Sequence, residues 1–188
     1  MTLVVVLKSV DGIVVAADSR ATIGDPRGVT AMNDTATKLY RINDQCALVL
    51  SGAAELANTL VDGLQKEQGI HKFGVDRLVI EASKNFRGKY AEWFKGMSQD
   101  QIPVINFIMV GLEKQNNAHQ VRTYLLSSQA NFSLQLATDG CMLAGVVQYA
   151  IYLKHRFYDV NMGLEQAMRL AVYLITETAT QDPKDRKS

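Results

Sequence analysis

The chain has 188 residues, of which 47% are hydrophobic and 21% charged, a composition typical of one domain with a sizeable core. Its formal net charge is +1, and no basic block is interleaved with aromatic residues, so the sequence lacks the usual signature of nucleic-acid binding. No apolar run approaches the length of about 18 residues needed to span a membrane, and the start lacks the charged lead and cleavage site of a secretory signal.

The two cysteines and three histidines are scattered along the chain. Cys46 and Cys141 fit a reducing compartment, and neither has the spacing of metal ligands. His71, His119 and His155 lie far apart in the sequence and form no HExxH-like pattern. There is also no glycine-rich phosphate loop of the GxGxxG or GxxxxGK type. We therefore expect a soluble cytoplasmic protein that uses no metal and no cofactor.

Two apolar runs, residues 3–7 and 13–17, open the chain. Asp11-Gly12 lies between them, and this dipeptide between apolar, β-branched runs is a strong hairpin signal. Because the hydrophobicity is continuous rather than alternating, we expect strands that are covered on both faces. The glycines and the proline of residues 23–28 then predict a loop.

Further along the chain, strand-like runs and helical periodicity follow each other in blocks. A second strand pair is expected first, with its turn at residues 43–44. In chain order, the patterns predict strands over residues 38–42 and 46–50, helices over 53–68 and 75–94, strands over 104–111, 121–126 and 132–137, and helices over 141–156 and 164–180.

This order of blocks favours an α+β fold. Two strand-rich blocks, each followed by two helices, suit two mainly antiparallel sheets with a helical layer outside each. No linker, low-complexity tract or repeat interrupts the sequence, so we expect a single domain over residues 1–188.

Thr2 directly follows Met1 and carries the first sign of chemistry. Removal of Met1 would place a hydroxyl nucleophile and a free α-amine on the same residue. An α-amine has a lower pKa than a lysine side chain, so part of it is unprotonated at neutral pH and can accept the hydroxyl proton. Many chains begin Met-Thr without any catalytic role, so this feature gains meaning only from the residues downstream.

Three short segments supply those residues. They are Ala16-Ala17-Asp18-Ser19-Arg20 at the end of the first hairpin, Thr37-Lys38-Leu39-Tyr40, and Ser51-Gly52-Ala53. Together with Thr2, this run resembles the β-type subunits of proteasome core particles and their simpler bacterial relatives, including HslV-type peptidases. It is most similar to a self-assembling bacterial proteasome homologue. The resemblance implies the four-layer αββα sandwich of N-terminal-nucleophile hydrolases.

The resemblance also implies a role for each matching residue. Thr2 corresponds to the nucleophile, Asp18 to the aspartate that orients the catalytic lysine, and Lys38 to that lysine. Gly52 corresponds to the glycine whose backbone N–H forms the oxyanion hole, and Asp182 to an aspartate near the threonine amine. The physics agrees, since a lysine ammonium near the threonine would lower the pKa of its amine and stabilise an alkoxide. Taken singly, these residues could equally be a surface ion pair, a solvated strand lysine and a turn glycine.

Substrate binding can be placed by the same resemblance. Thr22 matches the strand along which family members lay an extended peptide. Ala21, Ala36, Leu50 and Ala54 correspond to the first specificity pocket. Because these side chains are apolar and mostly small, we expect cleavage after hydrophobic residues.

Two further residues are expected to surround the catalytic group without reacting. Arg20 follows Asp18 closely, and Asp139 stands in Thr138-Asp139-Gly140, where the family usually has a serine near the threonine amine. A carboxylate there would favour the protonated amine and raise its pKa. The sequence therefore predicts an activity that is reduced or shifted to alkaline pH.

The function expected from these features is that of an N-terminal threonine endopeptidase acting on unfolded polypeptides. The resemblance implies a homo-oligomeric double ring of hexamers or heptamers, with an ATP-dependent unfoldase as a possible partner and no role for nucleic acid or membrane. Two alternatives stay open. The chain could be a non-catalytic ring subunit, or a small-amide hydrolase of the same nucleophile class.

Overall fold

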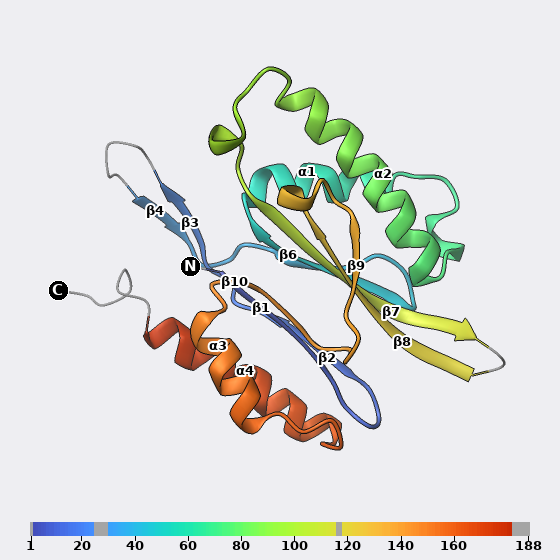
Figure 1. Ribbon diagram of the computed structural model, residues 1–188, viewed down its shortest axis with the longest axis vertical. Helices are drawn as coiled ribbons and strands as arrows, with labels where there is room; N and C mark the ends of the chain where they lie inside the picture. Colours follow the sequence, from blue (N-terminus) through green and yellow to red (C-terminus); the bar gives the residue numbers. More distant parts are fainter. Residues whose placement is uncertain (1, 25–29, 116–117, 182–188) are drawn as a thin grey trace. The chain divides into compact units, whose positions relative to one another are not determined.

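The computed structural model describes residues 2–24, 30–115 and 118–181 (Figure 1). The chain divides into two compact units. The first unit combines the residues up to Lys38 with those from Cys141 onwards, and the second unit is Leu39–Gly140. Thus both ends of the chain contribute to the first unit. The expectation of a single domain stays a prediction.

In the first unit, an antiparallel sheet of order β10-β1-β2 is covered on one face by two helices (Figure 1). β1 (Leu3–Lys8) pairs on one side with β2 (Ile13–Ala17) and on the other with β10 (Met142–Gly145). The helices are α3 (Gln148–Phe157) and α4 (Leu164–Thr180). The buried side chains between sheet and helices are Leu3, Val5, Leu7, Val14, Cys141, Ala150, Leu153, Ala167, Leu170, Ala171 and Leu174.

The first hairpin forms as its sequence predicts. In its turn, the Ser9 N–H donates to the Gly12 carbonyl at 2.9 Å, and the Ser9 hydroxyl donates to Asp11 Oδ1 at 3.0 Å. Val4 and Val6, which point away from the helices, are as completely buried as their neighbours in β1. The strand is therefore covered on both faces, which explains its continuous apolar sequence.

Residues 21–33 differ from the sequence prediction. β3 (Ala21–Gly24) and β4 (Thr30–Asn33) pair as an antiparallel two-stranded sheet, from Ala21 opposite Asn33 to Gly24 opposite Thr30. The predicted loop at residues 23–28 thus begins inside a strand, and its positions 25–29 lie outside the described residues. Pairing between the two arms decides the conformation here, a contact that the local glycine and proline signals do not report.

The second unit is built on a five-stranded antiparallel sheet of order β5-β6-β7-β8-β9. Its strands, from β5 to β9, are Leu39–Arg41, Cys46–Gly52, Ile105–Gln115, Ala118–Ser127 and Leu134–Leu136. Helices α1 (Ala54–Gln65) and α2 (Val75–Trp93) pack on one face, where Phe86 and Phe107 have ring centroids 4.5 Å apart. The short 3-10 helices η1 to η3 are Ile70–Lys72, Gln99–Gln101 and Ser128–Ala130.

One predicted helix is wrong in its first part. Residues 142–145 form strand β10 rather than the start of a helix, because β1 offers them a pairing edge from Leu3 opposite Gly145 to Val6 opposite Met142. Gly145 then has φ +95°, a conformation that favours glycine and ends the strand before α3. The last helix, by contrast, has the predicted bounds. Across the described ranges, no helix is long and apolar enough to cross a membrane.

Candidate active site

Thr2 lies just before β1, and its backbone is held by the end of β10. The Val146 N–H donates to the Thr2 carbonyl oxygen at 2.9 Å. Gly145 lies so close to this carbonyl that a Cβ at position 145 would overlap its oxygen. The positive φ of Gly145 and its missing side chain therefore allow the approach that fixes Thr2.

Asp18 follows the last residue of β2 and binds the backbone beside Thr2. Its Oδ1 accepts a hydrogen bond from the Leu3 N–H at 2.8 Å, and its own N–H donates to the Leu3 carbonyl at 3.3 Å. Its Oδ2 accepts a further bond from the Arg20 N–H at 3.2 Å. The hairpin thus returns the carboxylate to the start of the strand, and backbone donors fix both of its oxygens.

Lys38 joins this carboxylate to the threonine hydroxyl. Its Nζ lies 2.9 Å from Thr2 Oγ1 and 2.9 Å from Asp18 Oδ2, and it also donates to the Arg20 backbone carbonyl. The side chain is only 3% exposed, and burial of an ammonium is costly unless it is paired and hydrogen-bonded. An ammonium has three N–H donors, and the three acceptors use all of them.

The charge pattern suits a nucleophile better than a simple ion pair. One donor of the Lys38 ammonium points at the oxygen of Thr2, where negative charge would develop if the hydroxyl lost its proton. Asp18 balances the ammonium from the other side and fixes its direction. A hydroxyl that served only as a hydrogen-bond partner would not need a charged lysine whose three donors are all used.

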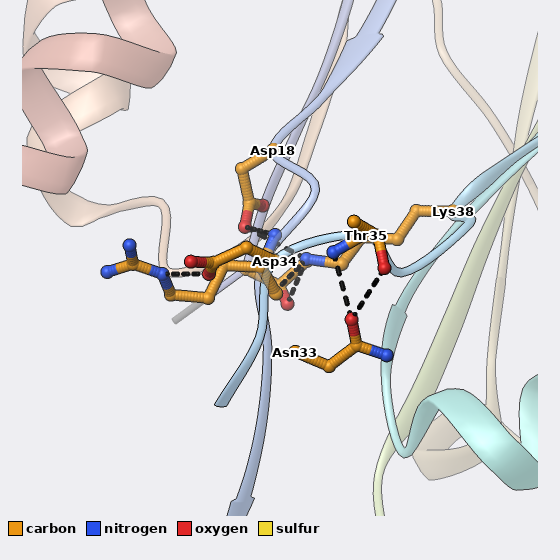
Figure 2. Close-up of polar contacts among 7 residues, drawn as sticks. Asp18, Asn33, Asp34, Thr35 and Lys38 are labelled. Atoms are coloured by element: carbon orange, nitrogen blue, oxygen red, sulfur yellow. Dashed lines mark hydrogen bonds and ion pairs between the residues drawn. The ribbon is translucent and has the colours of Figure 1, made fainter. Parts of the chain in front are cut away.

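Side-chain hydrogen bonds hold the segment that leads into Lys38. Asn33 Oδ1 accepts hydrogen bonds from the N–H and the hydroxyl of Thr35, both at 2.9 Å, which forms an Asx turn (Figure 2). Asp34, inside this turn, accepts a hydrogen bond from Arg20 Nε at 2.7 Å. Arg20 was expected near the site, whereas Asn33 and Asp34 were not.

A cavity of about 380 Å³ lies beside Asp18 within the first unit. Thr178 of α4 contributes to its wall, and the hydroxyl of this residue is buried without a hydrogen-bond partner. The other lining residues are Leu3, Asp18, Ser19, Arg20, Asp34, Ile175 and Ala179. Among the residues that the structure describes, no group of three or more His, Cys, Asp or Glu side chains could hold a metal ion.

With this geometry established, comparison with known proteins identifies the family. Residues 2–187 match the Proteasome subunit family, which is nearly the whole chain. The chain belongs to this family. A proteasome subunit beta of Methanosphaera stadtmanae is 21% identical over 178 residues, which covers 92% of this chain and 76% of that protein.

Solved structures of bacterial proteasome-like proteins are also similar. The Anbu complex from Pseudomonas aeruginosa, described as a helical assembly, has a TM-score of 0.76 and 20% identity over 96% of this chain and 76% of its own. Anbu from Yersinia bercovieri, described as an ancestral β-subunit, has a TM-score of 0.77 and 16% identity over 97% and 76%. A Gly-1 mutant of Anbu from Hyphomicrobium sp. strain MC1 has a TM-score of 0.74 and 18% identity over 97% and 77%.

These comparisons confirm the resemblance to proteasome β-type subunits and their bacterial relatives. They also confirm the fold class, the α+β fold of N-terminal-nucleophile hydrolases. Sequence identities near 20% to these solved structures show a shared fold but do not show a shared reaction. The roles of individual residues in this proteasome-family chain therefore rest on the site itself.

Some residues predicted from the family pattern lie in the second unit. Gly52 ends β6 opposite Ile105, and its φ of +103° favours glycine. Leu50 is 1% exposed and packs in the core of that unit, where half-buried Ala54 joins it. Asp139 lies exposed in the turn after β9. Their predicted roles as oxyanion donor, pocket residues and modulator stay predictions.

The other predicted substrate residues lie in the first unit. Ala21 and Thr22 belong to β3, where they pair with Asn33 and Met32 of β4. Half-buried Ala36 donates its N–H to the Ser19 carbonyl at 2.9 Å. Asp182 lies outside the described residues.

Proposed function

We propose that this proteasome-family chain is an N-terminal threonine endopeptidase that becomes active once Met1 is removed. The observation that supports the proposal most directly is the position of Lys38 Nζ, 2.9 Å from both Thr2 Oγ1 and Asp18 Oδ2. Family membership adds to it, because the chain matches over residues 2–187, which includes all three residues. The α-amine of Thr2 would supply the base that this cluster lacks.

In the proposed reaction, the Thr2 hydroxyl attacks the carbonyl carbon of a peptide bond, and its proton passes to the free Thr2 amine. The Lys38 ammonium offsets the negative charge on the nucleophile, and the Gly52 N–H donates to the oxyanion. The tetrahedral intermediate then loses the C–N bond, and the leaving amine takes the proton from the Thr2 ammonium. Water hydrolyses the resulting ester with the Thr2 amine again as base, which restores the hydroxyl.

The proposed substrates are unfolded polypeptides, cleaved after hydrophobic residues. β3 pairs with β4 along one edge, so an extended peptide adding at its other edge near Thr22 would gain backbone hydrogen bonds. Ala21, Ala36, Leu50 and Ala54 bring no charge to the proposed specificity pocket. A neutral, apolar pocket favours an apolar side chain, since burial of such a chain costs no polar desolvation.

We also propose that the chain works as an assembly of identical subunits. The helical assembly of the similar Pseudomonas aeruginosa Anbu complex supports this in general terms. The form expected from the sequence is a double ring of hexamers or heptamers, with an ATP-dependent unfoldase that delivers substrates. Sedimentation velocity of the purified chain would measure the size of the assembly.

A covalent probe tests the proposed peptidase directly. The chain is prepared without Met1, its intact mass is checked, and it is treated with a peptide epoxyketone, which needs both the amine and the hydroxyl of a terminal threonine. We expect one adduct on Thr2 together with cleavage of fluorogenic peptides that carry a hydrophobic residue before the reporter group. Thr2→Ala, the matched control, should lose both without a change in assembly.

Each negative result has a definite meaning. Complete removal of Met1 with neither adduct nor peptide cleavage would contradict the proposal and favour a non-catalytic subunit. An adduct together with hydrolysis of small amides but not of peptides would favour the small-amide hydrolase.

A further inference from the structure

The segment with Asp18, which precedes β3, runs beside the segment with Lys38, which follows β4. Their last regular pair is Ala21 opposite Asn33. Beyond it the contacts continue in antiparallel order, first from Arg20 to Asp34 and finally from Asp18 to Lys38. Between these two ion pairs, the Ala36 N–H donates a hydrogen bond to the Ser19 carbonyl and so joins the two segments. The ion pair between Asp18 and Lys38 is thus the last in a series of contacts that continues the β3–β4 pairing.

The two segments joined by these contacts, residues 18–21 and residues 33–38, differ in length. From Ala21 back to Asp18 the chain moves three positions, whereas from Asn33 to Lys38 it moves five. The Asx turn at Asn33 takes up the extra residues, since it folds the backbone at Thr35 back onto the Asn33 side chain. The position of Lys38 against Asp18 therefore depends on how this turn is held.

Arg20 connects the Asx turn to Asp18 and Lys38 through its N–H, its carbonyl and its side chain. Its N–H donates to Asp18 Oδ2, its carbonyl accepts a hydrogen bond from Lys38 Nζ, and its side chain donates to Asp34 Oδ1. The first two contacts touch both members of the catalytic ion pair. The third joins the same residue to the turn four positions before Lys38.

The ion pair between Arg20 and Asp34 is too exposed to contribute much to the stability of the fold. The Arg20 side chain is 37% exposed and that of Asp34 is 65% exposed. Pairs of this kind usually contribute little to folding, because water screens them and long side chains lose entropy. An effect of Asp34 on the reaction would therefore arise from geometry and not from loss of the fold.

We propose that Asp34 is a positioning residue for Lys38. Its ion pair with Arg20 holds the Asx turn and the Arg20 peptide groups in the register that points the Lys38 ammonium at Thr2 Oγ1. This inference rests on the proposed threonine peptidase function for its consequence, but its structural part concerns Lys38 alone.

Asp34→Asn tests the inference, because it removes the charge and keeps the shape. We expect kcat for a fluorogenic peptide to fall about two- to fivefold, the range that loss of an exposed ion pair can supply, with KM and the melting temperature unchanged. Asp34→Glu keeps the carboxylate and should restore most of kcat. Asp44→Asn is the matched control, since Asp44 accepts a 2.7 Å hydrogen bond from Arg41 in an exposed ion pair of the second unit.

A second measurement does not depend on turnover. Lys38 is buried and fully bonded in the parent chain, so acetic anhydride should modify it slowly compared with exposed lysines, as read by peptide mass spectrometry. Asp34→Asn should raise the modification rate of Lys38 selectively, and Asp44→Asn should not.

Failure of the two proposals can be told apart. A parent chain that neither reacts with the epoxyketone nor cleaves peptides would contradict the peptidase function, and Lys38 modification would still decide on positioning. An unchanged Lys38 modification rate in Asp34→Asn would overturn the positioning role. In an active parent, a kcat for Asp34→Asn equal to that of the parent would overturn it as well.

Discussion

The ion pair between Lys38 and Asp18 should be asymmetric, so that loss of the acid costs more stability than loss of the lysine. Lys38 is 3% exposed and Asp18 is 19% exposed, so water reaches the carboxylate but hardly the ammonium. Asp18→Asn leaves the ammonium buried without its counter-charge. Moreover, whichever way the new amide turns, its NH₂ group faces a backbone donor, the N–H of Leu3 or of Arg20.

The two costs follow from these contacts. Removing the partner of a buried charge typically costs about 3–5 kcal/mol, which applies to Asp18→Asn. Lys38→Met keeps two N–H donors on a partly hydrated carboxylate, so the loss should be about 1–3 kcal/mol, the cost of an unsatisfied buried group. In the double variant the buried ammonium is gone. The double variant should therefore be more stable than Asp18→Asn alone, although it carries a second substitution.

Thermal and urea unfolding at one protein concentration measure these differences, because assembly makes melting depend on concentration. A gap of roughly 2 kcal/mol corresponds to about 4–8 °C in a chain of this size. Lys84→Met, at an exposed helix position, is the control for loss of a lysine. The reasoning would be refuted if Lys38→Met were as destabilised as Asp18→Asn, or if the double variant showed the sum of both losses.

Three further predictions concern other residues. Gly145→Ala should lower both stability and the rate of epoxyketone labelling, because its Cβ would displace the Thr2 carbonyl; unchanged labelling would contradict this. Burial, and then the hydrogen bond to Asp76, raises the pKa of Tyr124 to about 12. Folding therefore opposes ionisation of Tyr124, and the free energy of unfolding should decline from about pH 10, where a free tyrosine ionises, towards pH 12. Tyr124→Phe should show a smaller decline in urea titrations across this range. Finally, Asp139→Ser should shift the pH–rate profile to lower pH if Asp139 raises the pKa of the Thr2 amine, and an unmoved profile would remove Asp139 from the site.

Much of the fold was predictable because the signals are local. The first hairpin follows from Asp11-Gly12 between apolar runs, and α4 has its predicted bounds because its apolar residues repeat at helical spacing. The approach of Asp18 to Thr2 was predictable from the hairpin, which must return Asp18 to the start of its partner strand, whereas Lys38 was placed beside them only by the family resemblance.

The rest depends on contacts between distant parts of the sequence. β10 forms because β1 offers an open edge, and residues 142–145 read alone resemble a helix. Gly145 within the predicted helix was a signal that could have been used, since a glycine at such a position often marks a break. Similarly, Asn33-Asp34-Thr35 has the composition of an Asx turn, but only the structure shows that Asp34 in this turn pairs with Arg20.

The way in which Thr2 is held bears on when the proposed enzyme becomes active. The contacts described above reach its hydroxyl through Lys38, its carbonyl through Val146, and the peptide group that follows through Asp18. None of these contacts uses the Thr2 nitrogen. The charged cluster can therefore form while Met1 is attached, when that nitrogen is an amide and cannot act as a base. In the proposed mechanism, removal of Met1 would then supply the base to a lysine and a hydroxyl that are already aligned, without any rearrangement of the fold.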